Sequence, residues 1–253
     1  MKILIRFLTG IVLCSSLFTL RAQPGPGGGS PGPDLSGAMS KLFGDHKAFT
    51  AGTEMQIKSA RSDEPMTMPG KMAYLEGKSR FEMDMTQMAG GKLPPGAAEQ
   101  MKQMGMDRMV MISLPDKKLA YAIYPTLKAY AEMPTPNAEK SGDATNFDLK
   151  ISELGKETLN GHACVKNKAT VTDKEGKTHE FTVWNATDLK KFPLKIETEE
   201  RNSTVVILFK DVKFTKPAAD QFEAPSDYKK YESMMALMQQ VLMKRMNVPE
   251  PQR

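Results

Sequence analysis

Apolar residues occupy alternate positions through most of the chain after residue 48. Between Phe49 and Ile57 the apolar side chains share one face of an extended chain, and Glu54 and Gln56 lie on the other. A period of two is typical of a half-buried β-strand. The pattern occurs in twelve segments and predicts about eleven strands. The segments that carry it are 49–57, 71–76, 79–86, 108–114, 119–124, 127–133, 147–151, 156–159, 162–172, 178–185, 192–199 and 204–214.

Short turns separate these segments. Gly77-Lys78 and Asn160-Gly161 are two-residue hairpin signals, and Pro115 opens a third connection. Short connections place consecutive strands antiparallel and side by side. The expected fold is mainly β (α+β), with one large curved antiparallel sheet and helices packed on its concave side.

Three segments change to the helical period. Leu35, Met39 and Phe43 predict a short helix that ends at Gly44, and a second helix is expected over 97–104. A longer helix is expected over 226–246, between Pro225 and Pro249. Its apolar stripe must be buried somewhere. The predicted stripe consists of Tyr231, Met235, Met238, Leu242 and Met246.

Two hypotheses explain that stripe. The helix could pack permanently on the sheet and close the core. Alternatively, it could form a displaceable lid over an apolar groove, because unbranched methionines make a less specific contact.

The N-terminus has the order of a secretory signal peptide. Lys2 and Arg6 precede an apolar run, and a cut after Ala22 would release the mature chain. A retained anchor and lipid modification of Cys14 are the alternatives, although Leu13 is large for a lipoprotein cut. We expect a signal peptide over 1–22, a Pro/Gly-rich linker over 23–34, one domain over 35–246 and a disordered tail over 247–253. The expected location is the periplasm or the medium.

Charge and cysteine content limit the classes of binding partner and the disulfides that the sequence allows. The formal net charge is +5, and loss of Lys2, Arg6 and Arg21 leaves 32 basic and 30 acidic residues. This near balance argues against a nucleic-acid partner. Cys164 is then the only cysteine, so an intramolecular disulfide is excluded and a buried thiol is expected. We expect a monomer that is not an integral membrane protein after cleavage.

No pattern in the chain predicts catalysis. The three histidines, His46, His162 and His179, lack the spacing of metal ligands, and neither a nucleophile elbow nor a phosphate loop occurs. We therefore expect no enzyme activity and no cofactor.

Methionine is the unusual residue, with 20 copies. Three hypotheses stay open: methionine replacing leucine in a core, a flexible apolar groove, and a soft-ligand site for copper. The expected groove residues are Met55, Ile57, Phe81, Met83, Met85, Met109 and Met111. The alternative metal ligands are Met101, Met104, Met106, Met109 and Met111.

Three groups of residues carry a resemblance to a known family. Residues 155–164 read Gly-Lys-Glu-Thr-Leu-Asn-Gly-His-Ala-Cys. Residues 182–189 read Thr-Val-Trp-Asn-Ala-Thr-Asp-Leu, and residues 192–197 read Phe-Pro-Leu-Lys-Ile-Glu. Phe-Glu-Ala-Pro at 222–225 precedes Tyr228. In this order they resemble the DUF4412 family of exported bacterial proteins, which is similar to the periplasmic lipoprotein carriers LolA and LolB. The resemblance covers 150–232 best.

The resemblance implies an open β half-barrel that wraps a helix and has an apolar concave face. The expected function is therefore a non-enzymatic carrier or binding protein, with lipid or lipoprotein acyl chains as its partner. A copper-handling protein and a structural envelope protein without a small ligand are the alternatives.

Overall fold

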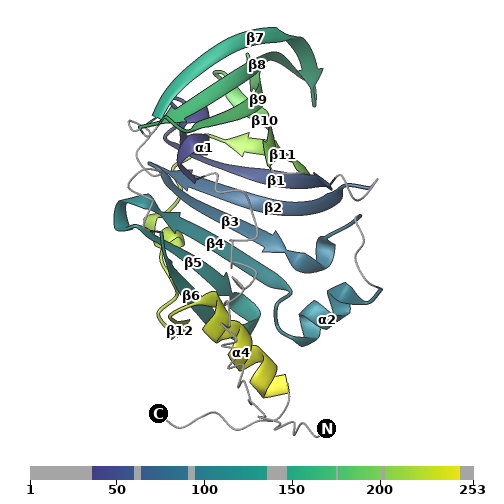
Figure 1. Ribbon diagram of the computed structural model, residues 1–253, viewed down its shortest axis with the longest axis vertical. Coiled ribbons are helices and arrows are strands. Elements are labelled where there is room, and N and C mark those ends of the chain that lie inside the picture. The colour runs from purple at the N-terminus through teal and green to yellow at the C-terminus, as the bar shows by residue number, and fades with distance from the viewer. Residues whose placement is uncertain are drawn as a thin grey trace, which may run out of the picture.

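The alternating segments pair into one twelve-stranded sheet in the computed structural model, which describes residues 36–59, 64–90, 95–135, 147–174, 176–200 and 203–245 (Figure 1). The strand order is β12-β6-β5-β4-β3-β2-β1-β11-β10-β9-β8-β7. All neighbours are antiparallel except β12 and β6. The strands are β1 (Ala48–Ser59), β2 (Met66–Leu75), β3 (Lys78–Asp84), β4 (Arg108–Leu114), β5 (Leu119–Tyr124), β6 (Ala129–Pro134), β7 (Phe147–Leu159), β8 (His162–Asp173), β9 (Thr178–Ala186), β10 (Phe192–Glu200), β11 (Ser203–Lys213) and β12 (Lys229–Tyr231).

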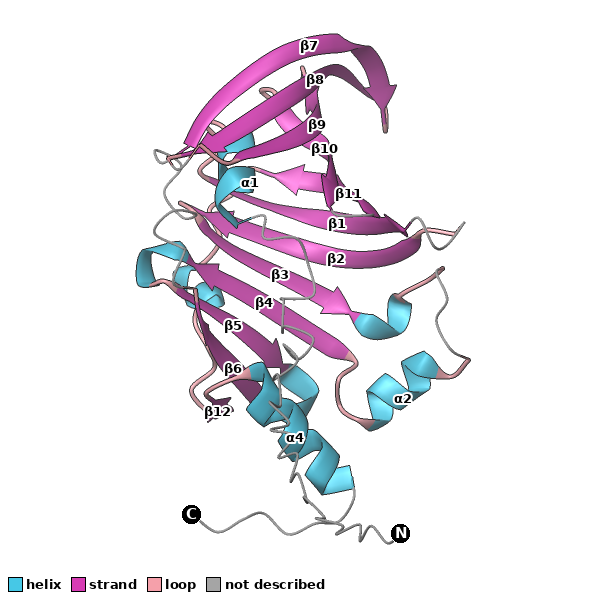
Figure 2. Ribbon diagram, in the orientation of Figure 1, coloured by secondary structure: helices cyan, strands magenta, loops and turns pink. Residues whose placement is uncertain are grey.

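The helices are few and short (Figure 2). The α-helices among the described residues are α1 (Ser36–Leu42), α2 (Ala97–Gln103) and α4 (Met234–Arg245). Short 3₁₀ turns are η1 (Met85–Gln87), η2 (Pro115–Lys117), η3 (Pro125–Leu127) and η5 (Ala219–Phe222). The prediction of a mainly β fold with a large curved antiparallel sheet is confirmed. None of the described helices has both the length and the hydropathy to span a bilayer.

The hairpin turns follow the residues that favour them. Asn160 and Gly161 both have positive φ, at 49° and 84°, as a two-residue turn of the primed type requires. The first hairpin turn is Glu76-Gly77 rather than Gly77-Lys78, because Leu75 pairs directly with Lys78. Glycine thus takes the second turn position in both hairpins.

Several strand boundaries differ from the prediction, most clearly those of β7, β2 and β3. The segments 147–151 and 156–159 form one strand, β7, whose register shifts between Glu153 and Gly155. Strand β2 begins earlier than expected, at Met66, although it contains Pro69 and Gly70. Strand β3 ends at Asp84, whose carboxylate accepts a hydrogen bond from the Thr86 N–H and starts η1. Met85 therefore does not continue the alternation of β3.

Helix α1 lies in the hollow of the curved sheet (Figure 1), and an aromatic cluster anchors it there. Phe43, just after α1, is 2% exposed, and its ring lies 4.8 Å from Phe49 and 5.8 Å from Phe209 between centroids. Phe192 of β10 stacks on it at 5.9 Å. The cluster therefore joins the helix to strands from both ends of the chain.

A smaller core covers the other face of β2, β4 and β5. Ala73, Ile112 and Ile123 are buried there with Phe222 of η5. Because both faces of these strands are covered, β4 carries an almost unbroken apolar run.

The prediction for the C-terminal helix is wrong about where the helix starts and about which of its faces is buried. Residues 229–231 form β12 beside β6, and the Lys229 N–H donates to the Lys128 carbonyl. The helix begins only after Ser233, whose hydroxyl accepts the Ala236 N–H as an N-cap. Leu237 is 1% exposed, whereas Met235 is 71% exposed.

The buried face of α4 is thus turned by about one residue from the predicted stripe. Met234, Met238 and Val241 pack against the core beside Leu237, and Leu242 is 53% exposed. Tyr231 lies in β12. Met246 and the predicted signal peptide (1–22), linker (23–34) and tail (247–253) lie outside the described residues.

Replacing Phe43 by alanine should lower the free energy of unfolding by about 3–5 kcal/mol, because it empties the centre of the aromatic cluster. The exposed Met235→Ala is the control and should change it by less than about 0.5 kcal/mol. Urea unfolding followed by circular dichroism measures both. Equal stability of the Phe43 variant and the parent would contradict the role of the cluster.

Candidate functional site: the methionine-rich face

The face of the sheet that carries α1 and α4 is lined with methionine. Met83 of β3 pairs directly with Met109 of β4, and Phe81 pairs with Met111. Met55 of β1 lies on the same face and pairs with Met68 of β2. We call this surface the methionine-rich face. Its residues are Met55, Ile57, Met68, Met72, Phe81, Met83, Met85, Met109 and Met111.

The structure brings the seven expected groove residues into one cluster and adds two. Strand β2 lies between β1 and β3, so Met68 and Met72 belong to the face as well. The Met-x-Met spacing of residues 66 and 68 is a sequence signal for the start of β2. However, Pro69 and Gly70 interrupt the apolar alternation, so the sequence predicts a strand only from residue 71.

Burial divides the face into a floor and a rim. Met55, Met83 and Met109 are 7%, 6% and 3% exposed, as core residues are. Ile57, Phe81, Met85 and Met111 are only partly buried against them. The rim is therefore the part that a ligand could reach first.

Tyr124 connects this face to α4. Its hydroxyl lies 3.5 Å from the Met109 sulfur and 3.6 Å from the Met234 sulfur. Burial raises the pKa of Tyr124, so the hydroxyl keeps its proton and remains a donor to either thioether. Apart from this contact, α4 meets the sheet mainly at β6 and β12.

The alternative metal ligands lie on two elements. Met101 is in α2, Met104 caps its end, and Met106 follows. Met109 and Met111 are on β4, and Met109 shares the Tyr124 hydroxyl with Met234. Among the described residues, no group of three or more His, Cys, Asp or Glu could hold a metal ion. The copper hypothesis therefore rests on thioethers alone.

One polar group interrupts the apolar surface. Thr53 is 4% exposed, and its Oγ1 has no hydrogen-bond partner among the described residues. It faces Gly70, over which the Phe81 ring lies: a Cβ added at Gly70 would be 3.1 Å from the Phe81 Cζ. A buried hydroxyl without a partner costs about 1–3 kcal/mol.

Thr53→Val keeps the shape of the side chain and removes the unpaired hydroxyl. We expect the free energy of unfolding to rise by about 1 kcal/mol, as measured in urea. Thr53→Ser is the matched control, since it keeps the hydroxyl and loses only a methyl. A valine variant less stable than the serine variant would show that the hydroxyl is satisfied.

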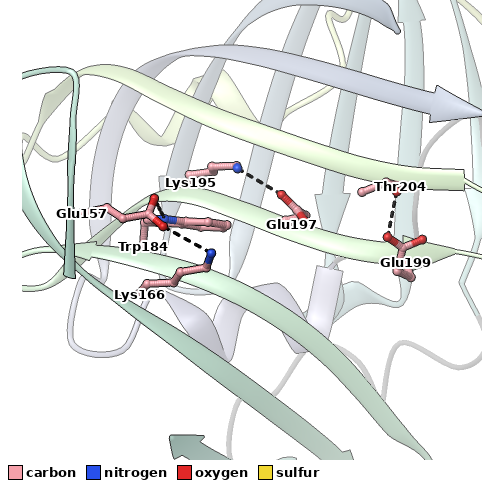
Figure 3. A network of polar contacts seen from close by, with 7 residues as sticks. All are labelled: Glu157, Lys166, Trp184, Lys195, Glu197, Glu199 and Thr204. Carbon is pink, nitrogen blue, oxygen red and sulfur yellow. Dashed lines mark hydrogen bonds and ion pairs between the residues drawn. The ribbon is translucent and has the colours of Figure 1, made fainter. Parts of the chain in front are cut away.

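The opposite face carries a charged network around Trp184 (Figure 3). The indole N–H donates to Glu157 at 2.8 Å, and Lys166 bonds the same carboxylate at 3.3 Å. The ammonium of Lys195 lies 3.9 Å from the ring centroid and pairs with Glu197. Since the five residues come from β7 to β10, the network ties four neighbouring strands together.

The hydrogen bond from Trp184 lowers the pKa of Glu157, and Lys166 lowers it further. The carboxylate therefore stabilises the fold above the unfolded pKa, and this contribution is lost as pH falls through the lower folded pKa. Trp184 is the only tryptophan. Its fluorescence should change with a midpoint below the usual glutamate range, and Glu157→Gln should abolish that change.

Glu157→Gln should also be less stable than the parent near neutral pH, with a gap that narrows at about pH 3. Glu153→Gln is the control, because Glu153 lies on the same strand and Glu157 is the carboxylate that accepts from the indole. A midpoint of the Trp184 fluorescence change above the usual glutamate range would contradict the hydrogen bond between Trp184 and Glu157.

A histidine–carboxylate pair lies near Cys164. The Nδ1 of His162 is 2.7 Å from Asp188, and this contact lowers the pKa of Asp188. Cys164 is 2% exposed and its pKa is raised, mainly by burial. A thiol with a raised pKa is a weak nucleophile. As the sequence predicted, Cys164 lies buried in a strand.

The chain is similar to several solved structures at low sequence identity. The lipoprotein LppX of Mycobacterium tuberculosis is 8% identical, with a TM-score of 0.40, over 72% of this chain and 95% of that one. LprF of Mycobacterium bovis is 11% identical, with a TM-score of 0.38, over 79% and 100%. A LolA superfamily protein of Nitrosomonas europaea is 9% identical, with a TM-score of 0.34, over 74% and 97%.

No curated protein sequence matches the chain. A family model, described as a domain of unknown function (DUF4412), matches residues 49–192. The match runs from β1 to the first residue of β10, so it extends well before residue 150, and Phe222 and Tyr228 lie beyond it. Because it covers more than half of the 253 residues, the chain belongs to the DUF4412 family.

Proposed function

We propose that the protein is an exported carrier that holds an acyl chain, or a similar flexible apolar ligand, against the methionine-rich face. The observation that carries the proposal is the continuity of that face across β1 to β4, with buried methionines as its floor and partly buried ones as its rim. The basic and apolar order of residues 1–22 supports export.

The chemistry of the face suits a flexible chain. Each buried CH₂ contributes about 0.8 kcal/mol, so the affinity for an acyl chain depends on the contact area. Thioether side chains have several rotatable bonds and can repack around chains of different length and bend. A face built from leucine or valine would fit one shape better and others less well.

Binding of an acyl chain would require side chains or a helix to move. The cavity beneath α1, bordered by Leu42, Leu149 and Ala169, holds about 20 Å³, which is little more than one water molecule. That cavity is too small for an acyl chain, and a chain held against the methionine-rich face would displace methionine side chains or α4. Helix α4 suits this role because the Tyr124 hydroxyl, which lies between the sulfurs of Met109 and Met234, connects it to the face, while its other contacts with the sheet are mainly with β6 and β12.

Native mass spectrometry of the protein, purified from a bacterial periplasm, should show a bound fatty acid or phospholipid. Replacing the rim residues Phe81 and Met111 together by alanine should weaken binding of a fluorescent fatty acid about tenfold, from lost apolar contact. The outward-facing pair Met235→Ala and Leu242→Ala is the matched control. Equal losses in both double variants, or copper in place of lipid, would refute the carrier hypothesis.

Deleting residues 232–253 tests the lid. If α4 is a displaceable cover, the sheet should remain folded and bind a hydrophobic dye more strongly than the full chain. Circular dichroism and dye fluorescence report the two properties. A deletion variant that unfolds outright would show instead that α4 closes the core.

A further inference from the structure

A second hollow lies on the face of the sheet turned away from α1 and α4. It has a volume of about 350 Å³ and spans β11, β1, β2 and β3, which lie side by side in Figure 1. Gln221 of η5 borders it. Thr50, Ala51 and Gly52 of β1 all line it, whereas Phe49 packs in the core on the other side. The volume falls within the range of small-molecule sites, which begins at about 300 Å³.

Small residues and a local irregularity keep the hollow open. Gly52 and Thr50 lie beside Ala73 across the β1–β2 pair. The register of β1 with β11 shifts between Thr50 and Gly52, and Asp211 there has a positive φ of 50°. The bulge turns the end of β11 relative to β1.

The chain itself does not require glycine at position 52. A Cβ there would meet only the Lys210 carbonyl at 3.6 Å and the Lys210 Cβ at 3.8 Å, which are ordinary contacts. At Gly70, by contrast, a Cβ would lie 2.6 Å from the Glu82 carbonyl oxygen. Glycine within a strand is less stable than alanine, because glycine loses more conformational freedom on folding. Such a glycine can mark a place where a ligand approaches the backbone.

The border of the hollow is charged and only partly neutralised. Arg80 pairs with Glu82 at 2.8 Å and donates to the Gln221 carbonyl at 3.0 Å, so its guanidinium is held in place. Lys71 and Lys213 also border the hollow, and neither has a hydrogen-bond or ion-pair partner in the described part of the chain. With Asp211, the border has three cations and two carboxylates.

We propose that this hollow binds a small hydroxylated anion, a phosphate monoester or a carboxylate. Lys71 and Lys213 would hold the anionic group, and Asp211 would accept a hydrogen bond from a ligand hydroxyl. Arg80, already fixed by two contacts, has N–H donors left for the same anion. The ligand approaches the backbone over Gly52. The site lies on the opposite side of the sheet from the methionine-rich face and does not depend on the carrier function.

Isothermal titration of the full chain with glycerol 3-phosphate at low ionic strength tests the proposal. The double variant Lys71→Gln/Lys213→Gln should weaken binding at least tenfold. The control Lys150→Gln/Lys156→Gln removes the same charge from β7, at the far edge of the sheet, and should bind as the parent does. Gly52→Leu should also abolish binding while urea unfolding shows an intact fold, because its side chain would fill the hollow.

A second binding measurement distinguishes a free phosphate ligand from the same group on a lipid headgroup. Vesicles of phosphatidylglycerol present the glycerol phosphate as a lipid headgroup, and phosphatidylcholine vesicles are the comparison. Binding of the free phosphate identifies a soluble ligand, and selective binding of phosphatidylglycerol vesicles alone identifies a headgroup. The proposal is overturned if neither is bound, if the β7 control loses as much affinity, or if a folded Gly52→Leu variant binds normally.

Discussion

The pairing of β1 with β11 is the contact on which the sheet depends. Strands β1 to β6 follow one another outward in one direction, and β7 to β11 return from the opposite edge, so only this pair joins the two series. It brings residues 52–59 beside residues 203–210. Such a distant contact is costly to form early, because the intervening chain must be ordered first. The aromatic cluster around Phe43 stabilises this junction, since it contacts both Phe49 and Phe209.

At this junction the two faces of the sheet are chemically different. On one face, Met55 and Met68 continue the apolar surface toward α4. On the other, the register shift at Gly52 interrupts the regular surface and leaves a charged hollow. Because successive side chains alternate between faces, the two surfaces occupy the same strands and share only one of the residues named for them, Met72. A substitution at any other of these residues can therefore be read separately for each face.

Much of this architecture was determined by the sequence itself. The alternation of apolar and polar residues predicted nearly every antiparallel strand, and Asn160-Gly161 predicted its hairpin turn. The same period placed Phe81 with Met83, and Met109 with Met111, on common faces. The methionine-rich face could therefore be predicted in part, because local periodicity fixes which side chains point the same way. Local periodicity could not show that β2 supplies Met68 and Met72 to the same face, beside Phe81 with Met83 and Met109 with Met111.

The tertiary structure decided what depends on distant partners. Residues 229–231 form a strand rather than a helix, because the free edge of β6 offers hydrogen bonds to them. Leu237 rather than Met235 is buried for the same reason: once the helix starts after Ser233, its orientation follows from the preceding strand. The charged hollow had no sequence signal, since Lys71, Arg80 and Lys213 are ordinary surface residues in separate strands. Strand order and register brought them together, and neither is encoded by any short segment.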